Sequence, residues 1–419
     1  MDKAAIVFPG QGSQYTGMAK EFYDEFGYVR DIFDQANEML GYDLADVCFH
    51  ADRDYLRQTS IAQVALLTSE VAAYQVLMKT QTIKPRFLAG HSLGEISALV
   101  CAGAIPFQEA VKLVRKRGEL MQEAVSEEKG GMIAVTDMDS SMVHYFCKLV
   151  QDKGKYVTVS IYNSANQTVV SGERDGLAEV EAIASKHGAN VTWLQVSAPF
   201  HCALMEPAAR ELQKLLYTLE FQNIQIPVLS NVNGLPYTGK NAIVDNLTQQ
   251  MTMPVQWNQI MYFLEAQDVN VMIDIGPKAT LRNMLRRSFP KIEGFAFDHS
   301  EDRDALALRL SKKIMDKMLF LHRCMAIAVC TPNANWNAEE YHTGVVVPYN
   351  ELKHTVEQLD TNGLSPSEEH IKQALNMLMK TFETKRTPND EKEMRLQQLI
   401  EETDSDEVYI QSLFSIVTY

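Results

Sequence analysis

The sequence predicts an α/β fold with a parallel central sheet, a smaller inserted subdomain and a helical C-terminal extension. Three observations lead to this prediction. In the first 130 residues, short apolar segments alternate with longer helical segments, which is typical of a parallel sheet packed against helices. Between residues 131 and 196 the order of segments changes, and afterwards the first rhythm returns. Beyond residue 301, helix signals dominate.

The parallel sheet is expected to begin with a strand at 4–8. This segment, AAIVF, is entirely apolar, as in strands that are buried on both faces, and the glycine-rich segment 9–13 ends it. The apolar-rich run 60–79 predicts a largely buried helix that is capped by Ser60. A strand, a sharp turn and a helix are expected to follow at 86–89, 91–93 and 95–101.

The segment 131–196 has the order β-α-β-β-α-β, which is that of a ferredoxin-like module. Its expected elements lie at 132–135, 140–151, 156–162, 168–171, 177–186 and 190–195. Strand signals typical of the first domain resume at 226–229 and 269–274. The module is therefore an insertion, and we expect the main domain to comprise residues 1–130 and 197–300.

The C-terminal segment 301–419 differs from the rest in charge and in pattern. It holds 13 Lys and Arg against 20 Asp and Glu, which is nearly half of the net negative charge of the chain. The sequence SPSE at 365–368 predicts a capping box with proline at the first helical position, and TP at 387–388 opens a further candidate helix. We expect a folded helical extension that either packs against the main domain or docks a partner protein.

Composition limits the class of protein. The 419 residues are 46% hydrophobic and 22% charged, which is ordinary for a globular protein and excludes wholesale disorder. The formal net charge of −15 repels phosphate backbones and anionic lipids, so neither nucleic acid nor a membrane is an expected partner. The six cysteines form no C-x-x-C pair, the N-terminus does not resemble a signal peptide, and no apolar run approaches the ~20 residues of a membrane span. We expect a cytoplasmic protein with free thiols and no metal site.

Ser92 is the expected nucleophile. It lies in the G-x-S-x-G sequence at 90–94, in which the glycines permit a tight strand-to-helix turn that exposes the serine hydroxyl. The predicted strand before Ser92 and the predicted helix after it are the context that this motif requires. An ordinary strand–turn–helix corner is the alternative interpretation.

A serine nucleophile needs a base, and His201 is the best candidate among the ten histidines. It follows Pro199, which holds the chain extended, in a loop that returns from the inserted module to the main domain. His91 is a rival, although a residue beside the nucleophile in a tight turn usually points elsewhere. The alternative for His201 is a hydrogen-bonded histidine in a surface loop.

Acyl transfer also needs hydrogen-bond donors for the oxyanion. The backbone N–H of Leu93, at the start of the helix after Ser92, is one candidate. The backbone N–H of Gln11, in the loop after the first strand, is the other. A plain strand-to-helix turn or a weak phosphate loop is the alternative for the G-x-G at 10–12. It lacks the third glycine and the acidic residue about twenty positions on that a dinucleotide site would need.

Taken together, the motifs resemble those of malonyl-CoA:acyl carrier protein transacylases, which serve fatty acid and polyketide synthesis. The resemblance runs from about residue 3 to about residue 300. It is carried, in order, by GQGSQ at 10–14, GHSLGE at 90–95, RG and MQ within 117–122, FH at 200–201 and the segment 250–257 that ends in PVQW. The resemblance implies an α/β-hydrolase-like domain with an inserted ferredoxin-like subdomain, in agreement with the pattern of elements above.

The resemblance also implies a role for each matched residue. Ser92 is the acyl-accepting nucleophile, His201 is its base, and the main-chain carbonyl of Gln250 orients the imidazole in place of a triad carboxylate. The N–H groups of Gln11 and Leu93 match the oxyanion hole.

Arg117 matches the arginine that binds the free carboxylate of malonate. Without the resemblance, its position in KLVRKR at 112–117 would suggest a solvated basic helix face. Met121 and Phe200 match residues that line the acyl pocket, and a phenylalanine directly before the histidine suits malonyl better than methylmalonyl. The implied partners are malonyl-CoA and an acyl carrier protein or carrier domain, and no cofactor is implied.

Two departures and two rival functions accompany the resemblance. Family members commonly have glycine at the position of Lys278, and the segment after about residue 301 has no counterpart in the basic enzyme. An acyl hydrolase of the same fold, which removes acyl groups from carrier proteins, is the nearest rival, but such enzymes tend to lose the arginine matched by Arg117. A non-catalytic scaffold that acts through its C-terminal segment is the rival from another class. The unusual extension favours polyketide over fatty acid synthesis.

Overall fold

The structure is a computed structural model of the chain that describes residues 3–124, 129–311 and 317–403. It divides into two compact units, Asp2–Ala307 and Leu308–Tyr419, and residues 404–419 of the expected extension lie outside the described residues. The division falls inside helix α14 (Ser300–Ser311), a few residues after the expected boundary. Ion pairs explain this position, because Asp302 pairs with Arg282 and Arg303 pairs with Glu21, which ties the first turn of α14 to the larger unit.

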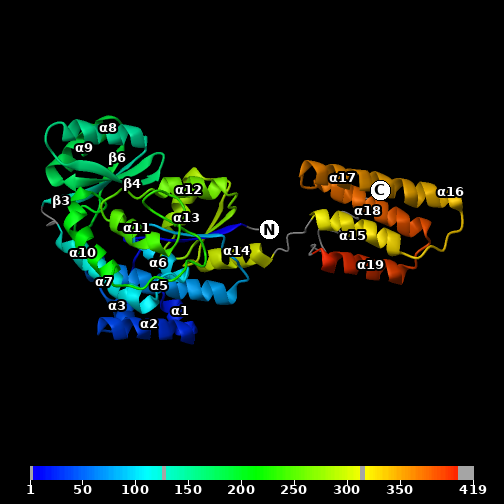
Figure 1. The fold of residues 1–419 in the computed structure, drawn as a ribbon, viewed down its shortest axis with the longest axis horizontal. Coiled ribbons are helices and arrows are strands. Elements are labelled where there is room, and N and C mark those ends of the chain that lie inside the picture. Colours follow the sequence, from blue (N-terminus) through cyan, green and yellow to red (C-terminus); the bar gives the residue numbers. More distant parts are fainter. Residues whose placement is uncertain (1–2, 125–128, 312–316, 404–419) are drawn as a thin grey trace. The chain divides into compact units, whose positions relative to one another are not determined.

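Five parallel strands form the central sheet of the larger unit (Figure 1). Their order is β7-β2-β1-β8-β9, and neighbouring strands pair in parallel. Every residue of β1, β2, β7 and β8 is buried, as expected for apolar strands covered on both faces. The prediction of a parallel α/β core is therefore confirmed. The strands are β1 (Ala4–Phe8), β2 (Phe87–Gly90), β7 (Val228–Leu229), β8 (Val271–Asp274) and β9 (Glu293–Ala296).

Helix α5 (Thr59–Thr80) is the long buried helix that the apolar run predicts. The prediction that Ser60 caps this helix is wrong, because Thr59 is already helical. The cap residue is Gln58, and its side chain makes no capping hydrogen bond. By length and composition alone, α5 is also long and apolar enough to cross a membrane. The sequence contains no uninterrupted apolar run there, because polar residues such as Gln63 and Glu70 lie within the helix. Of its apolar 18-residue window, 83% is buried inside the protein, as in the core helix of a globular unit.

Further helices of the larger unit pack around the same sheet (Figure 1). They are α1 (Lys20–Glu25), α2 (Gly27–Leu40), α3 (Leu44–His50), α4 (Arg53–Arg57), α6 (Leu93–Cys101), α7 (Phe107–Glu123), α10 (Glu206–Leu216), α11 (Ile243–Gln250), α12 (Trp257–Ala266) and α13 (Thr280–Ser288), with short 3-10 helices η1 (Ala203–Met205) and η2 (Lys240–Ala242).

The inserted subdomain is a four-stranded antiparallel sheet covered by two helices (Figure 1). Its strand order, β4-β5-β3-β6, is ferredoxin-like, as the sequence predicts. Backbone hydrogen bonds join β4 to the main domain: Val255 N–H donates to Ser160 O, and Tyr162 N–H donates to Val255 O, each at 2.9 Å. The elements are β3 (Gly130–Thr136), α8 (Ser140–Gln151), β4 (Val157–Ser164), β5 (Gln167–Glu173), α9 (Arg174–Lys186) and β6 (Asn190–Trp193).

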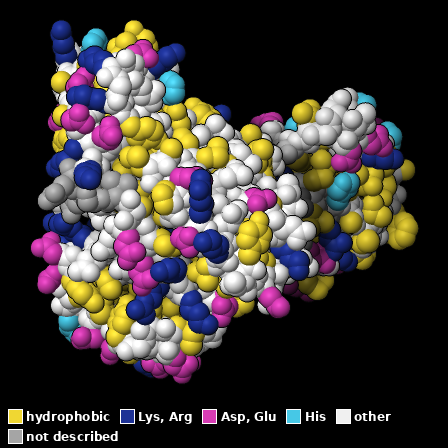
Figure 2. Space-filling view, turned by 60° about the vertical axis from the view of Figure 1, so that its left-hand side comes forward, with side chains coloured by type: hydrophobic (Ala, Val, Ile, Leu, Met, Phe, Trp, Pro, Cys, Tyr) yellow, Lys and Arg dark blue, Asp and Glu magenta, His cyan; other side chains and the backbone are white. Residues whose placement is uncertain are grey.

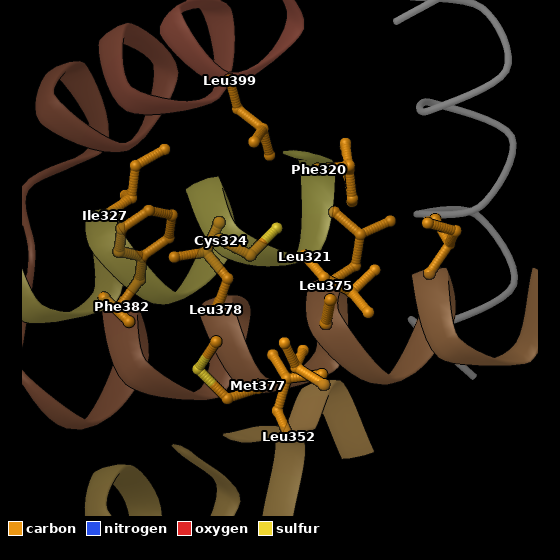
Figure 3. Close-up of a cluster of buried hydrophobic side chains, with 14 of the residues drawn as sticks. Phe320, Leu321, Cys324, Ile327, Leu352, Leu375, Met377, Leu378, Phe382 and Leu399 are labelled. Atoms are coloured by element: carbon orange, nitrogen blue, oxygen red, sulfur yellow. The ribbon is translucent and has the colours of Figure 1, made fainter. Parts of the chain in front are cut away.

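The C-terminal unit is helical and has a hydrophobic core of its own. Figure 3 shows side chains of α15 and α18 facing each other, with contributions from α17 and α19. Among the fully buried members are Phe320 and Cys324 of α15, and Leu378 and Phe382 of α18. The elements are α15 (Lys317–Cys330), α16 (Ala338–Tyr341), the π-helix η3 (His342–Val346), α17 (Val347–Asn362), α18 (Glu368–Thr384) and α19 (Asn389–Glu402).

Helix α18 begins with a capping box, two residues later than predicted. The cap is Ser367, whose N–H donates to His370 Nδ1 at 3.0 Å, while the His370 N–H donates to Ser367 Oγ at 3.4 Å. The expected pairing of positions 365 and 368 is wrong because the helix starts at Glu368, which leaves Pro366 before its first turn. The other predicted start is close to the observed one, since α19 begins directly after Pro388.

Candidate active site

Loops from four adjacent strands converge at one edge of the parallel sheet. Because β7, β2, β1 and β8 are parallel neighbours, their carboxyl ends lie at the same edge. Gln11 follows β1 and Ser92 follows β2, while Asn231 follows β7 and Lys278 follows β8. The topology therefore brings together four segments that are far apart in the sequence.

Ser92 lies in a sharp turn between β2 and α6. Its φ of 54° and ψ of −102° are values that residues with a side chain rarely adopt. The glycines of the motif leave room for this turn: a Cβ on Gly90 would lie 1.8 Å from the carbonyl carbon of Gly94, and a Cβ on Gly94 would lie 2.0 Å from Phe8 O. The Ser92 N–H donates to Asn231 Oδ1 at 2.7 Å, which holds the turn from the neighbouring strand. This geometry is that of a nucleophile elbow.

His201 lies within hydrogen-bond distance of the Ser92 hydroxyl. The distance from Ser92 Oγ to His201 Nε2 is 2.8 Å, and His201 Nδ1 lies 2.7 Å from the main-chain oxygen of Gln250. Because that carbonyl can only accept, the proton of the neutral imidazole lies on Nδ1, and Nε2 accepts from the serine. Burial, together with the charge of Arg117, lowers the pKa of His201 to about 3. The imidazole is therefore a neutral base at pH 7.

The rival histidine, His91, points away from the nucleophile. Its Nε2 lies 3.0 Å from Asn163 Oδ1 in the inserted subdomain, and its ring lies 5.7 Å from that of Trp257. Burial lowers the pKa of His91. The sequence argument that a residue beside the nucleophile faces elsewhere agrees with this position.

Arg117 is buried next to Ser92. It lies on α7 with 1% of its surface exposed, and its neighbours Arg115 and Lys116 are instead exposed and paired with Glu119. The alternative interpretation, a basic helix face in contact with solvent, is therefore correct for Arg115 and Lys116 and wrong for Arg117. Arg117 Nη2 donates to Ser92 Oγ at 3.1 Å and to Gln250 Oε1 at 2.8 Å.

The guanidinium of Arg117 has only neutral partners. Its Nη1 donates to Gln63 Oε1 at 2.9 Å, its Nε has no partner, and no carboxylate among the described residues forms an ion pair with it. Burial lowers the pKa of Arg117 to about 10, so the group is still charged at pH 7. The nearest acidic group that acts on it is Glu95, which is linked to Arg117 only through the Gln250 side chain. A buried cation without an anion in direct contact is unfavourable, and the site is therefore suited to a ligand that carries a carboxylate.

Two neighbours of the expected catalytic side chains were missed by the sequence analysis. Gln63, on α5, accepts from Arg117 and donates to Met121 Sδ at 3.5 Å. Asn231, besides accepting from the Ser92 N–H, donates to Gly90 O at 2.6 Å. A polar residue inside an apolar helix was a signal for the first, and a polar residue directly after a buried strand was a signal for the second.

Glu95 is a third residue that the sequence analysis assigned no role. Its carboxylate is buried and accepts from Gln250 Nε2 at 2.7 Å and from the Tyr237 hydroxyl at 2.5 Å. Burial raises its pKa to about 7, although these hydrogen bonds act in the opposite direction. Gln250 thus links Glu95, Arg117 and, through its main-chain oxygen, His201.

The remaining expected site residues line a small cavity of about 80 Å³ beside Ser92. The backbone N–H groups of Gln11 and Leu93 have no hydrogen-bond partner in the part of the chain that the structure describes, as an oxyanion hole requires. Met121 and Phe200 are buried and form part of the wall. The described residues contain no group of three or more His, Cys, Asp or Glu side chains that could hold a metal ion.

Comparisons with known proteins agree with this geometry. Residues 5–326 match the acyl transferase domain family. A malonyl CoA-acyl carrier protein transacylase of Bacillus subtilis is 35% identical over 397 residues, which cover 93% of this chain and 98% of that protein. It therefore has a counterpart for most of the C-terminal unit.

Solved structures match the larger unit. The malonyl CoA-acyl carrier protein transacylase from Coxiella burnetii has a TM-score of 0.72 and 36% identity over 74% of this chain and 98% of its own. A second match is a chain of the solved complex of a type II PKS acyl-carrier protein with its malonyl-transacylase. Its TM-score is 0.71 and its identity is 36%, over 74% of this chain and 100% of the matched chain. From its sequence, its fold and the arrangement around Ser92, the chain belongs to the acyl transferase domain family and, within it, to the malonyl CoA-acyl carrier protein transacylases.

Proposed function

We propose that the protein transfers a malonyl group from malonyl-CoA to the phosphopantetheine thiol of an acyl carrier protein, through a malonyl ester on Ser92. The observation that carries this proposal is the buried guanidinium of Arg117, which donates to Ser92 Oγ and has no carboxylate partner among the described residues. A malonyl group on Ser92 would bring its free carboxylate to this cation. The pair would be bidentate and desolvated, which is the strong form of this interaction.

In the first step, Ser92 Oγ attacks the thioester carbonyl carbon of malonyl-CoA while His201 Nε2 takes the hydroxyl proton. The negative charge that develops on the carbonyl oxygen is stabilised by the N–H groups of Gln11 and Leu93. The carbon–sulfur bond then breaks, and His201 returns the proton to the CoA sulfur. The malonyl group remains as an ester on Ser92.

In the second step, the thiol of the carrier protein's phosphopantetheine attacks the ester carbonyl and gives its proton to His201. The same N–H groups stabilise the second oxyanion. The carbon–oxygen bond to Ser92 breaks, and the proton passes from His201 to Ser92 Oγ. The products are malonyl carrier protein and the free enzyme, so no cofactor is consumed and none is expected.

The small cavity supports selectivity for short acyl groups. Its volume of about 80 Å³ is small, and we expect it to fit a short acyl group better than a fatty acyl chain. Phe200 is 5% exposed, and its main-chain oxygen accepts from Ser171 Oγ at 2.7 Å, which ties the backbone at Phe200 to the inserted subdomain. We expect the extra methyl group of methylmalonyl to be disfavoured there.

Other parts of the proposal rest on the relatives and on composition. The similar proteins are named for malonyl-CoA and the acyl carrier protein, and one of them is bound to a carrier protein of polyketide synthesis. Either polyketide or fatty acid synthesis fits these names, and the C-terminal unit favours the former. All six cysteines are free thiols, which supports a cytoplasmic location.

Intact mass measurement tests the function directly. The protein is incubated with malonyl-, methylmalonyl- or acetyl-CoA, with Ser92→Ala as the control, and then with a phosphopantetheinyl carrier protein. We expect a malonyl adduct that Ser92→Ala lacks and that passes to the carrier protein. Rapid loss of the adduct to water would instead identify an acyl hydrolase, and absence of any adduct would identify a scaffold.

A further inference from the structure

A second, larger cavity lies next to the one that contains Ser92. It has a volume of about 580 Å³, and Gln11, Leu194 and Val196 line both cavities. Its wall includes the cationic residues Arg53, Arg57 and Lys278. The larger cavity therefore adjoins the one that contains Ser92, and three cationic residues lie in its wall.

Lys278 has an unusual backbone conformation for a lysine. Its φ of 65° lies in the left-handed region that favours glycine. The loop is held on both sides: a Cβ on Gly276 would lie 2.3 Å from Pro9 Cγ, and the Lys278 N–H donates to Asp298 Oδ2 at 2.7 Å. The loop thereby presents the lysine next to the segment that carries Gln11. A side chain kept where glycine would be favoured is a reason to look for a function of that side chain.

The ammonium group of Lys278 is not neutralised by a direct carboxylate contact. Its Nζ donates to Gly12 O at 3.1 Å, and no ion pair involves it among the described residues. Burial and the charge of Arg53 lower the pKa of Lys278, and nearby Asp298 acts in the opposite direction. The Asp298 oxygens accept from the Tyr15 hydroxyl and from the Lys278 backbone N–H. The carbonyl is a neutral partner, so the Lys278 side chain has no anion in direct contact with it in the described part of the chain.

The other two cations of this wall differ from each other. Arg57 is paired with Asp54 at 3.1 Å and also donates to Gln195 Oε1. Arg53 is exposed and forms no ion pair in the described part of the chain, and its charge acts on Lys278. Two like charges that face one cavity repel each other, and a bound anion relieves this repulsion.

An anion is not drawn to this cavity by the protein as a whole. The chain carries a net charge of −15, and the face in Figure 2 has Lys and Arg interspersed among Asp and Glu. Binding of an anionic ligand must therefore depend on local cations.

We propose that Lys278, together with Arg53, binds the phosphate of a pantetheine thioester whose thiol end reaches Ser92. This inference rests on the proposed function, which makes pantetheine esters the substrates. CoA and the carrier protein both have a phosphate on the pantetheine chain, and the larger cavity is continuous with the acyl cavity through shared lining residues.

Steady-state kinetics with and without the phosphate test this assignment. The assay compares malonyl-CoA with malonyl-pantetheine, which lacks the phosphate, for the wild-type protein and Lys278→Met. We expect KM for malonyl-CoA to rise about fivefold, as for a partly exposed charge pair, with kcat unchanged. KM for malonyl-pantetheine should stay the same. The control is Lys214→Met, which removes an exposed lysine paired with Glu211 on α10 and should change neither KM.

Lys278→Gly gives a second, independent variant. It removes the ammonium and also relieves the left-handed backbone, so the melting temperature should be equal or higher while KM for malonyl-CoA rises as in Lys278→Met. A second arm measures transfer from malonyl-Ser92 to a phosphopantetheinyl carrier protein and to free pantetheine. A weaker reaction with the phosphate-bearing substrate alone supports the assignment. If it is seen in the first arm, the phosphate that Lys278 binds is that of CoA, and if it is seen in the second arm, the phosphate is that of the carrier protein.

Two results would overturn the assignment. Equal losses with and without the phosphate, or a loss in kcat alone, would mean that Lys278 acts on the oxyanion loop through Gly12 O. An unchanged KM for malonyl-CoA together with unchanged transfer to the carrier protein would mean that no phosphate binds to Lys278. Neither result resembles failure of the proposed function, in which the wild-type protein itself forms no adduct at Ser92.

Discussion

Replacement of Arg117 by alanine gives the sharpest test of acyl selectivity. In the wild-type protein, the guanidinium is 1% exposed and its hydrogen bonds go to Gln63, Gln250 and Ser92, all of them neutral. A malonyl carboxylate that meets this cation forms a desolvated ion pair. An acetyl group has no such carboxylate and leaves the cation unpaired.

The expected size of the effect follows from the burial of the pair. Removing one partner of a buried ion pair costs about 3–5 kcal/mol, because the other charge stays desolvated and unpaired. At 1.36 kcal/mol per factor of ten, kcat/KM for malonyl-CoA should fall by about 10²- to 10⁴-fold. Acetyl-CoA should lose only what the bond from Arg117 Nη2 to Ser92 Oγ contributes, about tenfold or less. The preference for malonyl over acetyl should therefore nearly disappear.

The assay is the rate of adduct formation on Ser92 with each CoA ester, and the decisive quantity is the ratio of the two kcat/KM values. Arg115→Ala is the matched control, since Arg115 lies on the same helix but is exposed and paired with Glu119 at 3.2 Å. Arg117→Lys keeps the charge and guards against misfolding of the alanine variant, which melting temperatures would reveal. A folded Arg117→Ala protein that still prefers malonyl by the wild-type ratio would refute this account of selectivity.

Four further predictions concern the site and the fold. Because the pKa of His201 is lowered to about 3, protonation of His201 should not reduce kcat/KM between pH 8 and about pH 5. Glu95 has a pKa of about 7 in the same network, so an acidic limb near pH 6.5 that persists in Glu95→Gln would contradict the neutral buried base. The same shift should reduce stability as the pH falls from about 6.5 towards 3, since the unfolded chain binds a proton at His201 that the folded chain does not. The raised pKa values of Glu95 and Asp274 act in the opposite direction, so urea titrations against pH that compare the wild-type protein with His201→Ala isolate this loss. Asn231→Ala removes the hydrogen bonds to the Ser92 N–H and to Gly90 O, and it should lower the unfolding free energy by about 2–3 kcal/mol and also lower kcat. The control is Asn223→Ala, at an exposed position, which should change neither quantity. An unaltered kcat in Asn231→Ala would exclude a role of Asn231 in holding the turn at Ser92. A chain that ends at Ser311 should still form the malonyl ester on Ser92, because the C-terminal unit has a hydrophobic core of its own. Mass spectrometry measures the adduct. A truncated protein that folds but forms no adduct would contradict this prediction.

Much of the fold was accessible from the sequence because the signals are local. The segment AAIVF at 4–8 is apolar throughout, and a strand buried on both faces is its simplest interpretation. The order of elements in the inserted subdomain also follows from local pattern. The Ser60 cap was wrong for a local reason as well, since several polar residues compete as the cap and only the backbone decides among them.

The candidate site was accessible in part. Arg117 falls on the buried face of α7 with Leu113, Val114 and Met121, so helical spacing alone could have separated it from the exposed Arg115. Gln63 and Asn231 were missed because a single polar residue in an apolar setting does not reveal its partner. Their partners, Arg117 and Ser92, are 54 and 139 positions away.

The sequence by itself determined the types of chemical group and the small set of elements that carry them: a serine in a glycine-framed turn, a histidine after a proline, and an arginine in a helix. The tertiary structure decided how these groups act on one another. Parallel pairing of four strands places their loops at one edge, burial removes water from Arg117 and His201, and the Gln250 carbonyl sets the imidazole tautomer. It also decided that Lys278 adopts a left-handed backbone and lines the larger cavity, because desolvation and distance depend on contacts that no local pattern encodes.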